Sequence, residues 1–169
     1  KLTVLGNNGP FPSAGGACSG YLVEENGKKL LVDCGNGVLS NLLKFTDFYE
    51  LDAIILSHLH SDHMSDMMIL RYAIQLKNKK RAVGKILDVF APSEPGDEYA
   101  RLDIKDAYNL KPITPGLELS FGKLKVSFCE MKHPVKSFAM SFSNGDKRFV
   151  YSGDTSWNQS IIEFAKSAD

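Results

Sequence analysis

The sequence feature that most constrains this chain is the segment 57–66, SHLHSDHMSD, which directly follows an apolar run. It holds three of the four histidines in the chain, His58, His60 and His63. Because residues two apart in an extended segment point to the same side, His58 and His60 can face one metal ion together. Asp62 and His63 come where the chain should turn into the next helix, so they can face a neighbouring position. The spacing therefore predicts ligands for two adjacent metal ions.

Two further candidate ligands, His133 and Asp154, each come at the end of a strand-like segment much later in the chain. Ligands commonly bind at the carboxyl ends of strands in α/β proteins, so these segments are expected to converge on the histidine-rich stretch at one sheet edge. Two divalent metals roughly 3.5–4 Å apart can bridge a water and convert it to a hydroxide nucleophile at neutral pH. The residue types thus point to metal-assisted hydrolysis.

The remaining pattern predicts one α/β domain over residues 1–169, with a mixed sheet and helices outside it. Hairpin turns are expected at Asn26-Gly27, Gly122-Lys123 and Asn144-Gly145. Helical spacing predicts helices over residues 38–48, over 64–80 with Ser65 as N-cap, within 93–110, and from 160 onward. Buried strands are expected over 51–57 and 85–92, and a Gly- and Pro-rich loop over 7–20.

The bulk composition excludes some partners. Lys plus Arg and Asp plus Glu number 20 each, so a protein that coats nucleic acid is not expected. The basic run 77–85 is interpreted as a solvated helix end, with a nucleic-acid contact as the less favoured reading.

No apolar run is long enough to span a bilayer, so no membrane contact is expected. Three widely spaced cysteines do not form a disulfide framework, and reduced thiols predict a cytoplasmic protein.

The string H-x-H-x-D-H after an apolar strand resembles the signature of the metallo-β-lactamase fold superfamily. The opening LGNNGPFPSAGGACSGYLVE and the turn LLVDCGNG resemble the ribonuclease Z-like branch of that superfamily. KHPVKSFAMSF is similar to the region of the third-motif histidine, and VYSGDTSWN to the region of the bridging aspartate. The resemblance covers residues 1–158 and implies an αββα sandwich with mixed sheets.

The resemblance also implies the ligands of two metal ions. The first ion would be held by His58, His60 and His133, the second by Asp62 and His63, and Asp154 would bridge both. Zn²⁺ is the expected metal, with Mn²⁺ or Fe as alternatives. Asp33 would orient a histidine from behind. Asp62 would also act catalytically, by moving a proton to the leaving group or from the bridging water.

Two departures from the family pattern shape the functional expectation. The superfamily usually supplies one more histidine to the second metal, downstream of the bridging aspartate, but no histidine follows His133 here. The chain is therefore expected to be partial, lacking the C-terminal part of the second half. Ribonuclease Z carries a long insertion between the third-motif histidine and the bridging aspartate. Only 20 residues separate His133 and Asp154 here, so processing of transfer RNA is not favoured.

The resulting hypothesis is a dinuclear zinc hydrolase whose metal-bridging hydroxide attacks a phosphodiester in a small-molecule or nucleotide-like substrate. Thioester, lactone and β-lactam substrates are alternatives, as is a non-catalytic metal-binding remnant. Flavodiiron redox proteins share the fold, but they place glutamate where this chain has His60. An incomplete sheet would also favour association between copies, so a homo-oligomer stays open.

Overall fold

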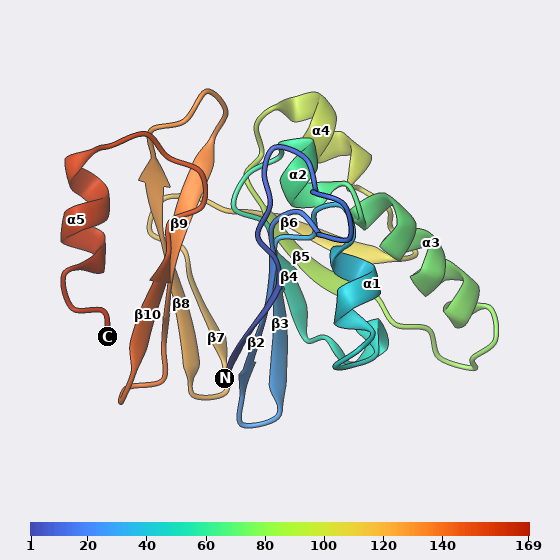
Figure 1. The fold of residues 1–169 in the computed structure, drawn as a ribbon. Helices are drawn as coiled ribbons and strands as arrows, with labels where there is room; N and C mark the ends of the chain where they lie inside the picture. The colour runs from blue at the N-terminus through green and yellow to red at the C-terminus, as the bar shows by residue number, and fades with distance from the viewer.

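The hairpin predicted around Asn26 and Gly27 is present and forms part of the first of two β-sheets. Both residues have positive φ angles, 46° and 78°, as a two-residue turn with matching strand twist requires. The turn joins strand β2 (Gly20–Glu25) to β3 (Lys28–Val32) in an antiparallel pair. The computed structural model describes all residues 1–169, and Figure 1 shows β2 and β3 side by side in the blue, N-terminal part of the chain.

The first sheet has six strands in the order β1-β2-β3-β4-β5-β6. Strand β2 pairs antiparallel with both β1 and β3, and the pairs from β3 to β6 are parallel, so the sheet is mixed as predicted. The remaining strands of this sheet are β1 (Leu2–Gly6), β4 (Ala53–Ile55), β5 (Leu87–Ala91) and β6 (Tyr108–Pro112).

The second sheet contains four strands, in the order β10-β9-β8-β7, and is antiparallel throughout. Its hairpins turn at Gly122 and Gly145, which have φ angles of 63° and 96°. Consecutive hairpins can only form antiparallel pairs, so the prediction of mixed sheets holds for the first sheet alone. The strands are β7 (Glu118–Phe121), β8 (Leu124–Met131), β9 (Ser137–Ser143) and β10 (Arg148–Tyr151).

The two sheets pack face to face, with helices on both outer sides, so the predicted αββα layering is present (Figure 1). The first sheet is covered by α1 (Val38–Leu42), α3 (Met67–Asn78) and α4 (Gly96–Arg101), and the second by α5 (Gln159–Ala165). Alternate residues of the central strands enter different cores. Leu31 and Ile54 pack toward the helices, whereas Leu30 and Ile55 pack toward the second sheet. Burial on both faces explains why these strands are apolar throughout.

Two predicted helices have different bounds in the structure. Ser65 is not the N-cap of a long helix, because a separate short helix α2 (Ser61–Met64) precedes it and α3 begins after Asp66. The Asp66 side chain instead accepts a hydrogen bond from the backbone N–H of Leu39, at 2.9 Å, which ties α1 to this corner. The helix predicted over 38–48 ends early, since the side chain of Asp47 caps a separate 3₁₀ turn, η1 (Phe48–Glu50).

Other boundaries shift in ways that matter for the site. The segment predicted as loop and helix over 93–110 ends in strand β6, because pairing with β5 and burial of Tyr108 override the local pattern. Strands β8 and β10 end at Met131 and Tyr151, before the predicted His133 and Asp154. Both candidate ligands therefore lie in the loops that follow the strands.

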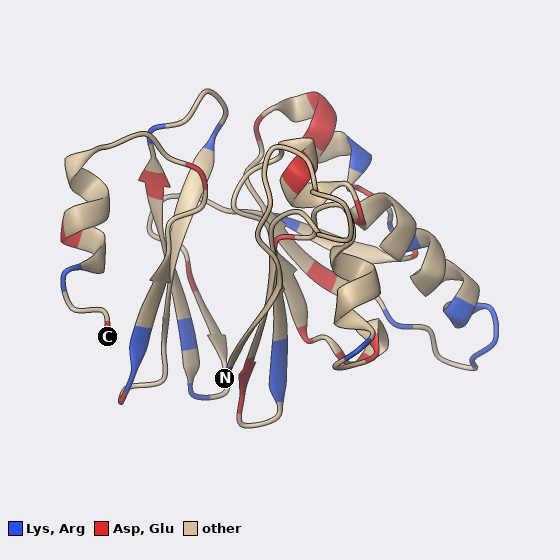
Figure 2. Ribbon diagram, viewed as in Figure 1, with Lys and Arg blue, Asp and Glu red and all other residues tan.

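The surface features are modest. None of the helices combines the length and the apolar character that crossing a membrane would need. All three cysteines are free, in agreement with the absence of a disulfide framework. The basic run 77–85 lies at the end of α3 that is remote from α2 (Figure 2). Within it, Lys77 forms an ion pair with Asp47, and the Arg81 guanidinium lies 4.3 Å from the centre of the Tyr49 ring.

Gly35 is the tightest point between β3 and the histidine-rich segment, and substitution there tests the fold. A Cβ atom on Gly35 would lie 1.9 Å from the carbonyl oxygen of Asp62. Gly35→Ala is therefore expected to lower the free energy of unfolding by about 1–3 kcal/mol, measured by urea denaturation. Gly96→Ala is the control, because its Cβ would meet no atom within 4 Å at the start of α4. Equal stability of the two variants would contradict this account.

Candidate metal centre

The histidine-rich segment changes from extended to helical within a few residues. His58 follows β4, and His60 is the N-cap of α2, with an extended backbone of φ −71° and ψ 150°. Asp62 and His63 lie within α2 itself. The change in backbone direction turns the side chains of these four residues toward one end of the sheet. The loops after β8 and β10 deliver His133 and Asp154 to the same end.

Three imidazole nitrogens form the first cluster. The Nε2 atom of His58 lies 3.1 Å from Nδ1 of His60, and Nε2 of His133 lies 3.0 Å from the same Nδ1. Around a tetrahedral zinc ion with bonds of about 2.0–2.1 Å, neighbouring nitrogens are about 3.3 Å apart. The three rings are therefore spaced for one ion, after an opening of a few tenths of an ångström.

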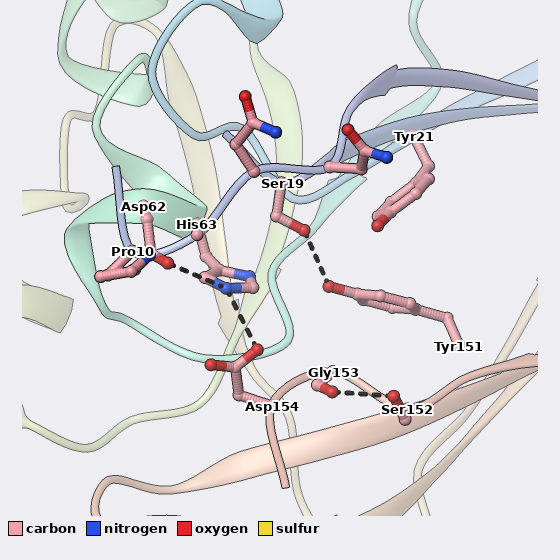
Figure 3. Close-up of a pocket in the computed structure, with 12 residues that line it drawn as sticks. Pro10, Ser19, Tyr21, Asp62, His63, Tyr151, Ser152, Gly153 and Asp154 are labelled. Carbon is pink, nitrogen blue, oxygen red and sulfur yellow. Dashed lines mark hydrogen bonds and ion pairs between the residues drawn. The ribbon is translucent and has the colours of Figure 1, made fainter. Parts of the chain in front are cut away.

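A second group of nitrogen and oxygen atoms lies beside the first. The Nε2 atom of His63 is 3.4 Å from an Asp154 carboxylate oxygen and 3.6 Å from one of Asp62 (Figure 3). Ligand atoms of His58, His63 and Asp154 all lie within 4.8 Å of one another. Carboxylate and imidazole are common ligands of zinc and related metals, so the donor set fits a second ion. The structure thus brings all six candidate side chains to this end of the sheet. The second group joins His63 and Asp154 with His58, and Asp62 lies beside it at 3.6 Å from His63.

His58 is held as a neutral ligand by its surroundings. Its side chain is buried, and burial together with the neighbouring His63 lowers the pKa of His58 to about 3. The Ser57 hydroxyl donates to Asp33 and lies 3.1 Å from Nδ1 of His58. Because that hydroxyl has only one proton, Nδ1–H of His58 must be the donor between these two groups. The Nε2 lone pair of His58 is then directed to the cluster.

Asp33 lies behind the cluster, fully buried, with an unusual φ of 56°. Its carboxylate accepts hydrogen bonds from the backbone N–H and the hydroxyl of Ser57, at 2.7 and 2.9 Å. It also accepts from Nδ1 of His63 at 2.7 Å and from the Tyr151 hydroxyl at 2.6 Å. Burial opposes ionisation of Asp33, but the hydrogen bond and charge of His63 outweigh it and hold the Asp33 pKa below its usual value.

His63 and Tyr151 respond to the same carboxylate. Burial disfavours protonation of His63, yet the hydrogen bond to Asp33 and its charge raise the pKa of His63 overall. Burial and the nearby Asp33 charge raise the pKa of Tyr151, so its hydroxyl stays protonated and can donate. Sequence reasoning suggested that Asp33 orients a histidine but did not identify Ser57 or Tyr151. Their role depends on contacts between segments far apart in the chain.

A cavity of about 530 Å³ opens beside the second group. Neutral polar residues and the candidate ligands form most of its wall, and no Lys or Arg takes part. The Gly- and Pro-rich loop borders it, and a Cβ on Gly9 would lie 3.1 Å from Asp62. The lining residues are Asn7, Asn8, Gly9, Pro10, Ser19, Tyr21, Asp62, His63, Tyr151, Ser152, Gly153 and Asp154.

Comparison with known families agrees with this geometry. The family model described as "Beta-lactamase superfamily domain" matches residues 28–169. The chain is 35% identical over 169 residues to "Probable metallo-hydrolase YhfI" of Bacillus subtilis, covering 100% of this chain and 69% of the relative. It is 34% identical over 137 residues to a ribonuclease Z of Methanopyrus kandleri, covering 79% of this chain and 47% of that protein.

Solved structures show the same fold. The crystal structure of the metallo-β-lactamase fold protein YhfI from Bacillus subtilis superposes with a TM-score of 0.94, at 34% identity, over 99% of this chain and 68% of that one. The short form of human tRNase Z gives a TM-score of 0.76 at 18% identity, over 99% of this chain and 74% of that one. At this identity the likeness shows a shared fold and nothing more. This chain therefore spans about half to three quarters of the relatives described.

Metal binding at the cluster should appear directly in stability. Zinc at about 100 times its dissociation constant is expected to raise the free energy of unfolding by about 2.7 kcal/mol. His60→Ala should remove most of that gain, because the nitrogens of His58 and His133 both lie beside His60. Ser61→Ala, an exposed neighbour, is the control and should keep the gain. Calorimetric unfolding with and without zinc checks this, and an equal gain in both variants would contradict it.

Proposed function

Because this chain belongs to the metallo-β-lactamase superfamily, we propose that it is a dinuclear zinc hydrolase that cleaves phosphodiester bonds in small substrates. Its broader class is that of a metal-dependent hydrolase, in keeping with the family and the histidine cluster. One observation carries the proposal: imidazole and carboxylate groups from three separate segments converge beside one open cavity. A purely structural role would not need such ligands next to a polar cavity.

The ligand set divides into two positions. His58, His60 and His133 would hold the first ion, and Asp62 with His63 the second. Asp154 would serve both, since it lies in the loop after β10, faces His63, and has a carboxylate oxygen within 4.8 Å of a His58 ring nitrogen. Zinc bound there would generate a nucleophile from water at neutral pH and stabilise the charge that develops on the substrate oxygens.

Asp62 is the residue we assign to proton transfer. Its carboxylate borders the cavity, where the backbone of Gly9 closely approaches it. A carboxylate at this place can accept a proton from the attacking water and pass it to the leaving group. The loop residues Asn7 and Asn8, on the same wall, would contact the substrate with neutral amide groups.

Two observations favour a small phosphodiester. Relatives with 34% and 28% identity are named ribonuclease Z, and a ribonuclease acts on phosphodiester bonds. The cavity wall has no Lys or Arg, which a polyanionic substrate such as transfer RNA would be expected to require. A wall without Lys or Arg therefore supports a small or nucleotide-like ester. Structures of metallo-β-lactamases resemble this chain at only 12–17% identity, so they do not favour a lactam.

Hydrolysis of bis-p-nitrophenyl phosphate by the purified, zinc-loaded protein tests the proposal. His60→Ala is expected to lower kcat/KM by about 100-fold or more. It removes the imidazole whose Nδ1 lies next to the Nε2 atoms of both His58 and His133, and with it one proposed ligand of the first ion. Ser61→Ala is the matched control. Activity that survives in His60→Ala would contradict the assignment.

The same preparation separates the alternatives. Turnover of thioesters, lactones or β-lactams without phosphodiester turnover would favour those substrates. Iron in the metal analysis of the protein as purified, before zinc is added, together with reduction of oxygen would favour a redox protein. Zinc uptake with no turnover of any ester would favour a non-catalytic metal-binding protein.

A further inference from the structure

Tyr151 joins the two sheets at the end where the candidate ligands gather. It is the last residue of β10 in the second sheet, whereas Asp33 directly follows β3 in the first. The Tyr151 hydroxyl donates to Asp33 at 2.6 Å. It also lies 3.0 Å from the Ser19 hydroxyl, the contact that Figure 3 shows. Its single proton is therefore directed to Asp33 and away from the cavity, which argues against Tyr151 as a proton donor to substrate.

The carboxylate that Tyr151 contacts also orients His63. One oxygen of Asp33 receives the Tyr151 hydroxyl, the Ser57 hydroxyl and Nδ1 of His63. Because the carboxylate is fully buried, no water replaces a lost donor without rearrangement. Loss of the Tyr151 hydroxyl would leave that oxygen freer to move, and the His63 ring would move with it.

The same strand end also carries Asp154. Only Ser152 and Gly153 separate Tyr151 from Asp154, and the far nitrogen of His63 faces Asp154 at 3.4 Å. Tyr151 is therefore joined to Asp154 by two routes, which together form a closed path. One route is the series of side-chain contacts through Asp33 and His63, and the other is the backbone from residue 151 to residue 154. The path links both sides of the second metal position.

The turn within this path is tightly held. Gly153 has a φ of 56°, and a Cβ there would lie 3.0 Å from Cβ of Ser57. The Ser137 hydroxyl donates to the carbonyl oxygen of Asp154 at 2.9 Å and fixes the other end of the turn. With so little room, a shift of Tyr151 would be passed to the backbone of Asp154.

We propose that Tyr151 is a positioning residue for the second metal site, setting His63 through Asp33 and Asp154 through the following turn. The inference rests on the two-metal arrangement of the proposed function. It assigns Tyr151 no contact with the metal or the reacting atoms. The first site connects to the path only through the Ser57 hydroxyl, which lies between Asp33 and His58.

Zinc titration of the metal-free protein by calorimetry is the first test. Tyr151→Phe keeps the ring and removes only the hydroxyl. Affinity for the second equivalent should therefore fall about 10-fold or more, and affinity for the first equivalent should fall by much less. Tyr21→Phe is the matched control, because its ring lies 4.9 Å from that of Tyr151 in the same cavity wall. Tyr21→Phe should bind both equivalents as the parent does.

Nitrogen-15 spectra of the histidines in the metal-free protein give the second readout. Tyr151→Phe should shift the His63 ring signals and leave those of His133, which does not contact Asp33, unchanged. Unchanged His63 signals would overturn the inference, as would parental affinity for both zinc equivalents. An equal loss of both equivalents, with a lower melting temperature, would also overturn it, because that pattern indicates a general structural role.

Neither readout involves hydrolysis. A parent protein that binds two zinc ions but does not cleave bis-p-nitrophenyl phosphate would contradict the proposed function and leave the test of Tyr151 intact. A parent that binds a single zinc ion would contradict the two-metal arrangement, and the inference for Tyr151 with it.

Discussion

The buried carboxylate of Asp33 is the interaction on which the geometry of the centre depends. A fully buried charge is costly unless it is paired and hydrogen-bonded, and here donors from three other segments meet it. Ser57 extends β4, His63 belongs to α2, and Tyr151 ends β10 in the other sheet. The cost of leaving Asp33 unpaired therefore favours the one arrangement in which these three elements meet.

Parallel pairing brings these donors to the same place. Strand β4 pairs in parallel with β3, so their carboxyl ends lie side by side. Asp33 directly follows β3, and Ser57 lies two residues beyond β4. The short helix α2 then turns His63 back onto Asp33, with its other ring nitrogen facing outward. A mostly apolar sheet that is buried on both faces thus supports a polar site beyond the carboxyl ends of its strands. There, imidazoles and carboxylates face an open cavity.

Part of this centre was predictable because part of it is local. His58, His60, Asp62 and His63 lie within one strand end and one helical turn, and their spacing alone suggests shared ligation. His133 and Asp154 came from the ends of strand-like segments and from the family resemblance, although both strands end earlier than predicted. The layered α/β architecture followed from hairpin turns and apolar strands.

The contacts that depend on distant packing were not predictable. Tyr151 reaches Asp33 across 118 residues of sequence, and no local pattern distinguishes it from an ordinary strand residue. Strand β6 was read as part of a loop and helix, since only its pairing with β5 makes it a strand. The N-cap assigned to Ser65 failed because α2 occupies that stretch and Asp66 hydrogen-bonds to the start of α1.

The central claim is that this edge of the sheet holds two adjacent metal ions. Anomalous diffraction at the zinc absorption edge, on crystals of the zinc-loaded protein, measures this most directly. The account predicts two peaks roughly 3.5–4 Å apart, one among His58, His60 and His133 and the other among Asp62, His63 and Asp154. No peak at this edge, or peaks only at other surface sites, would contradict it.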